Sequence, residues 1–240
     1  MKRIKMLLMS LGVVVFLVGC GQYEGPTDYK MVNGKKVMIE VNTGRLFNGD
    51  YTITKVNNQG VDFTSESGNM EDGLPTAVTY YNGGGVPSSF LTYNKYGGID
   101  TYKSVDTDGL LNSYIEFSDK NTDNNFYIVM NIDALLKKKL LKSYKMYYPG
   151  TTVLREVYKK EVITSYFKNG KKSFEIDTNG ETDPAKYRKL REWNKAGVLL
   201  QDTNVKERTG TTYYPVSGKK HIVLTKKKRT EYRENGSKMD

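Results

Sequence analysis

Residues 162–176 read VITSYFKNGKKSFEI, and this stretch contains the pattern that decides the fold. Two runs rich in β-branched and aromatic residues flank the pair Asn169-Gly170. Alternation with a period of two is typical of a half-buried strand. Asn-Gly is a strong signal for a two-residue hairpin turn, because both residues tolerate the positive φ angles of that turn. The stretch therefore predicts a β-hairpin with Asn169 and Gly170 at the centre of its turn.

The same pattern recurs along most of the chain. In the first half, the turn glycines are 11, 13, 11, 13 and 12 residues apart, so a strand-turn-strand unit recurs about every 24 residues. In the second half the spacings are 20, 27, 21 and 18 residues. The glycines are Gly49, Gly60, Gly73, Gly84, Gly97 and Gly109, then Gly150, Gly170, Gly197, Gly218 and Gly236. A single hairpin cannot bury its apolar face, so neighbouring hairpins must combine to form a core. The sequence predicts an all-β fold, an elongated antiparallel hairpin array or meander.

Two segments have helical features. Asp133 can cap a short helix over residues 134–143, in which four leucines occupy one face and four lysines the rest. Residues 183–197 begin with Asp-Pro and end with Gly, as helices do. The repeat spacing argues for a strand there instead, before the turn at Gly197. We predict a short helix in the first segment and a strand from about Leu190 in the second.

Three segments carry a family resemblance, namely residues 165–172, 213–220 and 231–238. They resemble the MORN-type variant repeats of a bacterial antitoxin-like family, which repeat the pattern Tyr-Tyr-x-x-Asn-Gly-Lys. Looser matches are residues 147–150 and 192–199, and residues 29–35 with 46–49 are similar to the lead-in of such proteins. The resemblance covers residues 29–240 and is strongest after Tyr147; in the first half, double and triple glycines replace the single glycine and the following Lys is mostly missing. It implies an extended antiparallel β array, often lipid-anchored, with no known common active site.

The first twenty residues have the features of a targeting segment. Lys2, Arg3 and Lys5 precede a largely apolar run of 13 residues, 6–18. A membrane-spanning helix needs roughly 20 apolar residues, whereas signal-peptide cores have roughly 7 to 15. The run ends in Leu-Val-Gly-Cys, which resembles the lipobox of bacterial lipoproteins and implies lipidation of Cys20, the single cysteine of the chain. The alternatives are an ordinary signal peptide followed by an accidental Cys, or a buried core cysteine.

This assignment predicts the organisation of the chain. Residues 1–19 form a lipoprotein signal peptide, 20–28 a spacer after the lipidated cysteine, 29–133 a first β-repeat region and 134–240 a second, MORN-like region. The net charge of the whole chain is +10, but it is unevenly distributed. Residues 20–134 contain 8 basic and 15 acidic residues, whereas 135–240 contain 26 basic and 12 acidic. The halves thus attract each other, or the basic half faces a polyanion.

The sequence offers little for catalysis or metal binding. One cysteine excludes an internal disulfide framework, and His221, the single histidine, lies in a β-branched run that predicts a strand or surface position. Residues 106–109 resemble the start of a calcium loop, but the expected acidic ligand is replaced by Ile115. We predict no enzyme, no metal and no cofactor, although distant carboxylates could still form a hydrolase pair on the same scaffold.

Basic clusters are the strongest remaining feature. The candidate site residues for an anionic surface are Lys219, Lys220, Lys226, Lys227, Lys228 and Arg229. With Lys171-Lys172 and Lys159-Lys160 they would form a ladder along one face or edge if the units stack in register, and anionic lipid head groups would attract them. The alternative is that these lysines protect strand edges from aggregation. Nucleic acid is not an expected partner, because the predicted signal peptide implies export and the basic clusters have no recognisable nucleic-acid motif.

The predicted function is that of a lipoprotein anchored in the bacterial cell envelope, at the outer membrane and periplasm or on the outer face of the cell membrane. Its β-repeat body would be a non-catalytic binding or scaffolding surface for a protein or an envelope polymer. The 19 tyrosines belong to the repeat core, or form a face that binds glycans or protein. Exposed terminal strands allow self-association. The alternatives are a toxin-neutralising, antitoxin-like protein and an envelope hydrolase.

Overall fold

The computed structural model describes residues 15–16, 27–32, 35–57, 59–122 and 131–239. Cys20 and nearly all of the predicted signal peptide lie outside these residues, so lipidation stays a prediction. Two compact units are present, residues 1–87 and 88–240, and each is described by itself. Both are built from antiparallel hairpins, which confirms the all-β hairpin array.

The first unit contains a three-stranded meander of β4 (Gly49–Val56), β5 (Asp62–Glu71) and β6 (Leu74–Tyr81). Strand β1 (Val15–Phe16) pairs with β4. A separate hairpin, β2 (Thr27–Val32) with β3 (Lys35–Glu40), is joined to the meander by backbone bonds, including one of 2.8 Å from the Met38 N–H to the Gly73 carbonyl. A Cβ on Gly73 would stand 2.6 Å from the carbonyl oxygen of Met38, so this close approach of the two backbones requires glycine.

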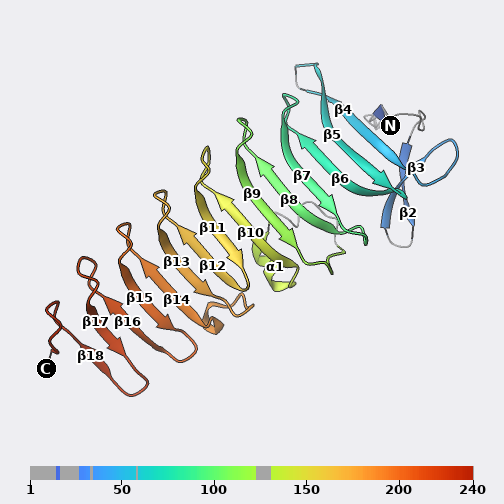
Figure 1. Ribbon diagram of the computed structural model, residues 1–240. Helices are drawn as coiled ribbons and strands as arrows, with labels where there is room; N and C mark the ends of the chain where they lie inside the picture. The colour runs from blue at the N-terminus through green and yellow to red at the C-terminus, as the bar shows by residue number, and fades with distance from the viewer. Residues whose placement is uncertain (1–14, 17–26, 33–34, 58, 123–130, 240) are drawn as a thin grey trace, which may run out of the picture. The chain divides into compact units, whose positions relative to one another are not determined.

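The second unit is a single meander in which each strand from β7 to β18 pairs with the next (Figure 1). Its strands are β7 (Pro87–Tyr93), β8 (Ile99–Val105), β9 (Leu111–Phe117), β10 (Leu141–Tyr147), β11 (Leu154–Lys159), β12 (Val162–Tyr166), β13 (Lys172–Asp177), β14 (Lys189–Trp193), β15 (Leu199–Asn204), β16 (Thr209–Tyr213), β17 (Lys220–Leu224) and β18 (Arg229–Glu231).

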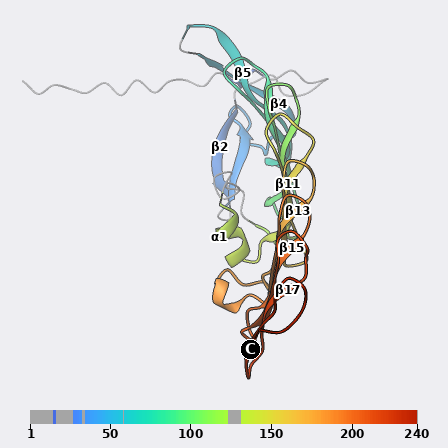
Figure 2. The same cartoon turned by 90° about the vertical axis from the view of Figure 1, so that its left-hand side faces the viewer.

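The turns of this meander alternate between two edges of the sheet. We call one the glycine edge, because each of its turns has a glycine with positive φ: Gly109, Gly150, Gly170, Gly197, Gly218 and Gly236. The opposite edge holds α1 (Ile132–Lys137) and the 3-10 turn Pro184–Lys186, and we call it the helix edge. Figure 2 shows α1 and the 3-10 turn on one side of this sheet.

The turn at Asn169-Gly170 is correctly located, but its predicted type is wrong. Gly170 has a φ of 79°, whereas Asn169 is not among the residues with positive φ. The Phe167 N–H donates to the Lys171 carbonyl, and the Gly170 N–H donates to Phe167. The loop therefore has three residues, with glycine in the left-handed position and a register shift in the strand before it. The two-residue turn with two positive φ angles occurs instead at Lys160-Glu161, without glycine.

The predicted helix over 134–143 is also displaced. Helix α1 covers only Ile132–Lys137, and its cap is Asn131, whose side chain accepts from the Ala134 N–H at 3.0 Å. The expected cap, Asp133, lies inside the first turn. Strand β10 already begins at Leu141, because pairing with β9 and β11 satisfies its backbone on both sides. In the second segment β14 begins at Lys189, so the strand predicted from about Leu190 is confirmed.

One row of side chains crosses the meander from β7 to β14. Residues that pair across antiparallel strands point to the same face, so the register places these side chains in line on what we call the inner face: Leu91, Tyr102, Ile115, Tyr144, Tyr158, Ile163, Ile176 and Leu190. The first five are buried, with exposed fractions of 2%, 6%, 3%, 2% and 6%, and Leu135 of α1 is fully buried as well. The last three are only half-buried.

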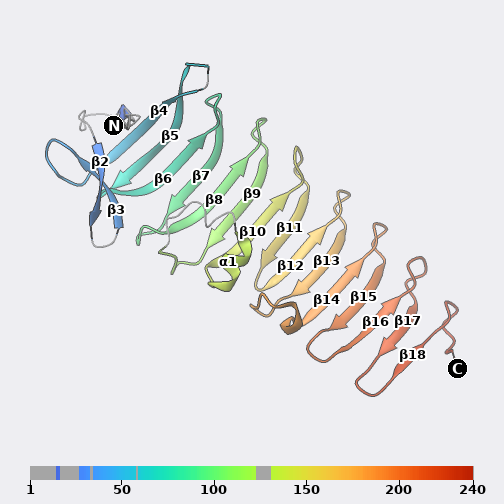
Figure 3. The ribbon, with the colours of Figure 1, turned by 180° about the vertical axis from the view of Figure 1, so that it is seen from behind.

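From β12 onward the inner-face side chains are only half-buried, and from β15 onward the second unit is a sheet one layer thick. Figure 3 shows β15 to β18 from behind, and in this view and in Figure 1 no described helix or strand covers them. No side chain of these last strands is fully buried. The sheet keeps two solvent-accessible faces, which is unusual because an apolar face is normally packed against a second layer.

Ion pairs across strands hold this thin region together on its outer face. Arg191 Nη1 lies 2.8 Å from Glu175 Oε1, and its Nε lies 3.3 Å from Asp202 Oδ2. Lys172 and Lys189 extend the network to those carboxylates at 2.6 and 3.2 Å. Burial alone would raise the pKa of Glu175, but Lys172 and Arg191 together lower that pKa below its ordinary value. These charges form a network across β13, β14 and β15, and a network contributes more to stability than isolated surface ion pairs do.

Candidate binding surfaces

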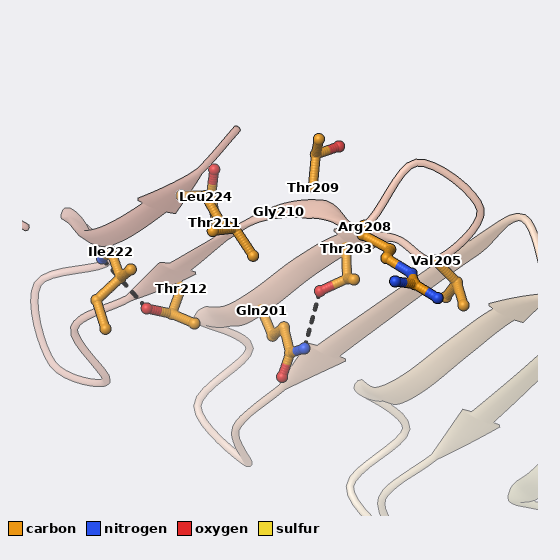
Figure 4. Close-up of a pocket in the computed structure, with 10 residues that line it drawn as sticks. All are labelled: Gln201, Thr203, Val205, Arg208, Thr209, Gly210, Thr211, Thr212, Ile222 and Leu224. Carbon is orange, nitrogen blue, oxygen red and sulfur yellow. Dashed lines mark hydrogen bonds between the residues drawn. The ribbon is translucent and has the colours of Figure 1, made fainter. Parts of the chain in front are cut away.

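The inner face contains a hollow beyond the end of the apolar row, where a glycine occupies the next-but-one position in the register. Continuing from Leu190, the register leads to Thr203, Gly210 and Leu224. Since Gly210 has no side chain, a depression of about 390 Å³ opens over β15, β16 and β17. Figure 4 shows the residues that line it: Gln201, Thr203, Val205, Arg208, Thr209, Gly210, Thr211, Thr212, Ile222 and Leu224.

Close backbone packing explains why glycine occupies this position. A Cβ on Gly210 would stand 2.9 Å from both the Asp202 carbonyl oxygen and Thr203 Oγ1. Any larger residue would have to displace the neighbouring strand β15, and it would also fill the hollow. The depression is thus a consequence of a backbone approach that only glycine allows.

The chemistry of the hollow suits binding more than reaction. Val205, Ile222 and Leu224 supply aliphatic surface, and Arg208 is the single titratable residue in the lining. Two polar groups already have partners: the Gln201 amide donates to Thr203 Oγ1 at 2.8 Å, and Thr212 Oγ1 accepts from the Ile222 N–H at 3.2 Å. A nucleophile, a base and an orienting acid do not meet in this lining, as covalent catalysis would need.

Two buried tyrosine–glutamate pairs were not foreseen from the sequence. Tyr144 OH donates to Glu156 Oε1 at 2.6 Å in the second unit, and Tyr51 OH donates to Glu66 Oε1 at 2.6 Å in the first. Burial, reinforced by the neighbouring carboxylate, raises the pKa of both phenols. These phenols stay neutral donors, which is a structural role. The tyrosine and the glutamate of each pair are 12 and 15 residues apart in the sequence, so no local sequence pattern marks either pair.

The predicted anionic-surface residues do not form one ladder. Lys219 and Lys220 lie at the glycine edge, whereas Lys226, Lys227, Lys228 and Arg229 lie at the helix edge, at the other end of β17. Lys171-Lys172 join the first group and Lys159-Lys160 the second. The physical reason is the meander itself, since each strand carries the chain from one edge to the other. One flat anionic surface therefore cannot contact all of these residues through a single edge.

The other singled-out residues have ordinary surroundings. His221 lies in β17, and its ring centroid is 4.6 Å from that of Tyr214. Asp106 Oδ1 accepts from the N–H groups of Asp108 and Leu110, so this carboxylate caps a turn. Within the described ranges, no group of three or more His, Cys, Asp or Glu side chains is placed to hold a metal ion. In the same part of the chain no helix has the length and apolar character needed to cross a membrane.

Comparison with known proteins leaves the family open. Neither a protein-family model nor a curated protein matches the chain. A solved structure described as the crystal structure of TarM aligns with 55% of this chain, at 8% sequence identity and a TM-score of 0.24. The match spans 19% of the length of that structure's chain. Similarity at this level supports no argument about fold or activity.

Proposed function

We propose that this chain is a lipid-anchored protein of the bacterial cell envelope whose β-repeat body is a non-catalytic binding surface. One observation carries the binding assignment: the apolar row of the inner face continues past the covered part of the sheet through Ile163, Ile176 and Leu190 and ends at an aliphatic hollow. Contiguous apolar surface left open to water is typical of an interaction site. The anchor rests on the sequence alone, namely the cationic start, the core length and the Leu-Val-Gly-Cys ending at Cys20.

Metabolic labelling tests the anchor. We expect cells that express the full chain to incorporate radiolabelled palmitate into it, because the thiol of Cys20 is the predicted attachment point. A Cys20→Ala variant should lose the label completely. Ser10→Ala, a change within the same targeting segment, should retain it. Labelling that persists in Cys20→Ala, or that is missing from the unaltered chain, would rule out the lipoprotein assignment.

Variants of the two sheet faces test the binding surface. With the full-length Cys20→Ser chain as bait in envelope extract, we expect Leu190→Glu on the inner face to reduce capture of the retained partner at least about tenfold, since an unpaired charge would be buried in an apolar contact. The control is Val157→Glu, which places the same charge on the outer face, away from the lining of the hollow. Equal losses in the two variants would contradict an inner-face site.

A further inference from the structure

The glycine edge of the last strands carries almost only positive charge. Its turns and the adjoining strand starts, residues 167–172, 194–198, 214–220 and 232–238, contain a single acidic residue, Glu234. Their basic residues are Lys168, Lys171, Lys172, Lys195, Lys219, Lys220, Arg233 and Lys238. All eight are exposed. We call this set the lysine row.

The helix edge differs because carboxylates neutralise many of its cations. Arg188 lies 3.3 Å from Asp177, Arg229 lies 2.7 Å from Glu231, and longer contacts join Lys186 to Glu181 and Lys226 to Glu207. Among the residues that the structure describes, one member of the lysine row forms an ion pair, namely Lys172 with Glu175. Lys168 Nζ lies 5.7 Å from the centroid of the Tyr148 ring. The lysine row therefore keeps most of its positive potential.

The meander gives the lysine row a regular spacing. Two strands separate each turn from the next on the same edge, so consecutive turns are roughly 9.5 Å apart at the usual strand spacing of about 4.8 Å. Four such turns form a line roughly 28 Å long. The turns that carry the cations are thus arranged in a line at nearly constant intervals.

Hydrogen bonds between neighbouring turns fix this arrangement. The Asn169 amide donates to the Lys195 carbonyl at 3.0 Å, and the Asn194 amide donates to the Pro215 carbonyl at 2.7 Å. Tyr214 OH then donates to the Tyr232 carbonyl at 2.8 Å. Each turn is bonded to the next, so the backbone positions from which the basic side chains extend are set before any ligand binds. Pre-organisation of this kind lowers the entropy lost on binding.

We propose that the lysine row is a binding site for a linear, phosphate-bearing polymer that lies along the glycine edge. A line of regularly spaced cations matches a line of anions, and release of counterions from the polymer drives the association. A membrane surface fits less well, because Val216 is the one large apolar side chain exposed on these turns, and insertion between head groups needs more apolar area. This inference goes beyond the proposed function, since it concerns a different surface and stands even if the inner face binds nothing.

Salt dependence of binding tests the proposal. The probe is inorganic polyphosphate, titrated by calorimetry into the full-length Cys20→Ser chain at several salt concentrations. We expect measurable affinity that falls steeply with salt. The variant Lys195→Gln/Lys219→Gln/Lys220→Gln/Lys238→Gln should reduce the slope of log K against log salt by roughly 3, at about 0.7 for each lost contact. Within the described part of the chain, the side chains of these four lysines are exposed and form no hydrogen bond or ion pair, so we expect the fold to persist, as circular dichroism would show.

A matched variant separates position from net charge. Lys206→Gln/Lys226→Gln/Lys227→Gln/Lys228→Gln removes four charges from the helix edge and should leave the slope nearly unchanged. A second arm, Asn194→Ala/Tyr214→Phe, removes two of the bonds between turns without altering the charge, and it should weaken binding several-fold.

Four results would overturn the proposal. They are absence of polyphosphate binding at low salt, equal loss of slope in the two lysine variants, orthophosphate affinity equal to that of polyphosphate, and tighter binding to phosphatidylglycerol vesicles than to polyphosphate. The last result would identify the lysine row as a membrane contact. None of these outcomes affects palmitate labelling or inner-face capture, so failure here is distinguishable from failure of the proposed function.

Discussion

Replacing Tyr144 by alanine is expected to lower the free energy of unfolding of the second unit by about 4 kcal/mol. Tyr144 is 2% exposed, its ring stacks on Tyr158 at a centroid distance of 5.7 Å, and its hydroxyl donates to Glu156. The substitution removes the aromatic ring from the centre of the apolar row and leaves Glu156 without its phenol donor. Urea unfolding of the full chain, followed by tyrosine fluorescence and circular dichroism, measures the change.

Two further variants separate the parts of this effect. Tyr144→Phe keeps the ring and removes the hydrogen bond, so a smaller loss of about 1 to 3 kcal/mol is expected. Tyr213→Ala removes a half-buried tyrosine at the thin end of the sheet and should have a smaller effect than Tyr144→Ala. A loss below about 1 kcal/mol for Tyr144→Ala would contradict the placement of the core in the covered part of the sheet.

Leu135→Ala is expected to destabilise the second unit by about 3 kcal/mol and to release helix α1 from the sheet. Helix α1 has six residues, far fewer than the roughly 12 to 15 that an isolated helix needs, and Leu135 is its single buried residue. Packing of this side chain therefore holds the helix in place. The hydrogen-exchange rates of the α1 amides should rise by the factor that corresponds to the lost free energy of unfolding. Urea unfolding should give the same loss of free energy.

The neighbouring leucine supplies the control. Leu136 is only half-buried and lines a depression of about 270 Å³ at the helix edge. We expect Leu136→Ala to change the unfolding free energy by less than half of the Leu135→Ala effect. If the two variants lose equal stability, or if α1 keeps its exchange protection in Leu135→Ala, the helix is held by contacts other than the buried side chain.

The sequence was sufficient to predict the all-β hairpin class and the positions of several glycine-edge turns. Alternating runs around residues 162–176 correspond to β12 and β13, and turn glycines such as Gly170 and Gly218 have the positive φ angles that the pattern required. The helix bounds were wrong because tertiary pairing extended β10 into a segment with helical amphipathicity. Local propensity was overridden by the backbone hydrogen bonds that β9 and β11 offer.

The edge on which each lysine lies could not be predicted. Sequence signals marked the glycine-edge turns, whereas several helix-edge turns have no glycine: Lys160 and Glu161 adopt positive φ without it, as does Arg208. Without these turns, the number of strands between two lysine clusters is unknown, and that number decides whether the clusters share an edge. The inner-face hollow was equally hidden, since it depends on the pairing of Gly210 with Thr203 and Leu224.

The alternation of turns between two edges restricts how such a protein can change in length during evolution. If two adjacent strands are duplicated, every turn that follows them stays on the edge where it was, and the sheet becomes longer by one repeat. Duplication of a single strand would exchange the edges, so every later lysine turn would face the side that holds α1. Growth by whole hairpins therefore preserves both surfaces, whereas growth by an odd strand inverts the charge pattern of everything that follows.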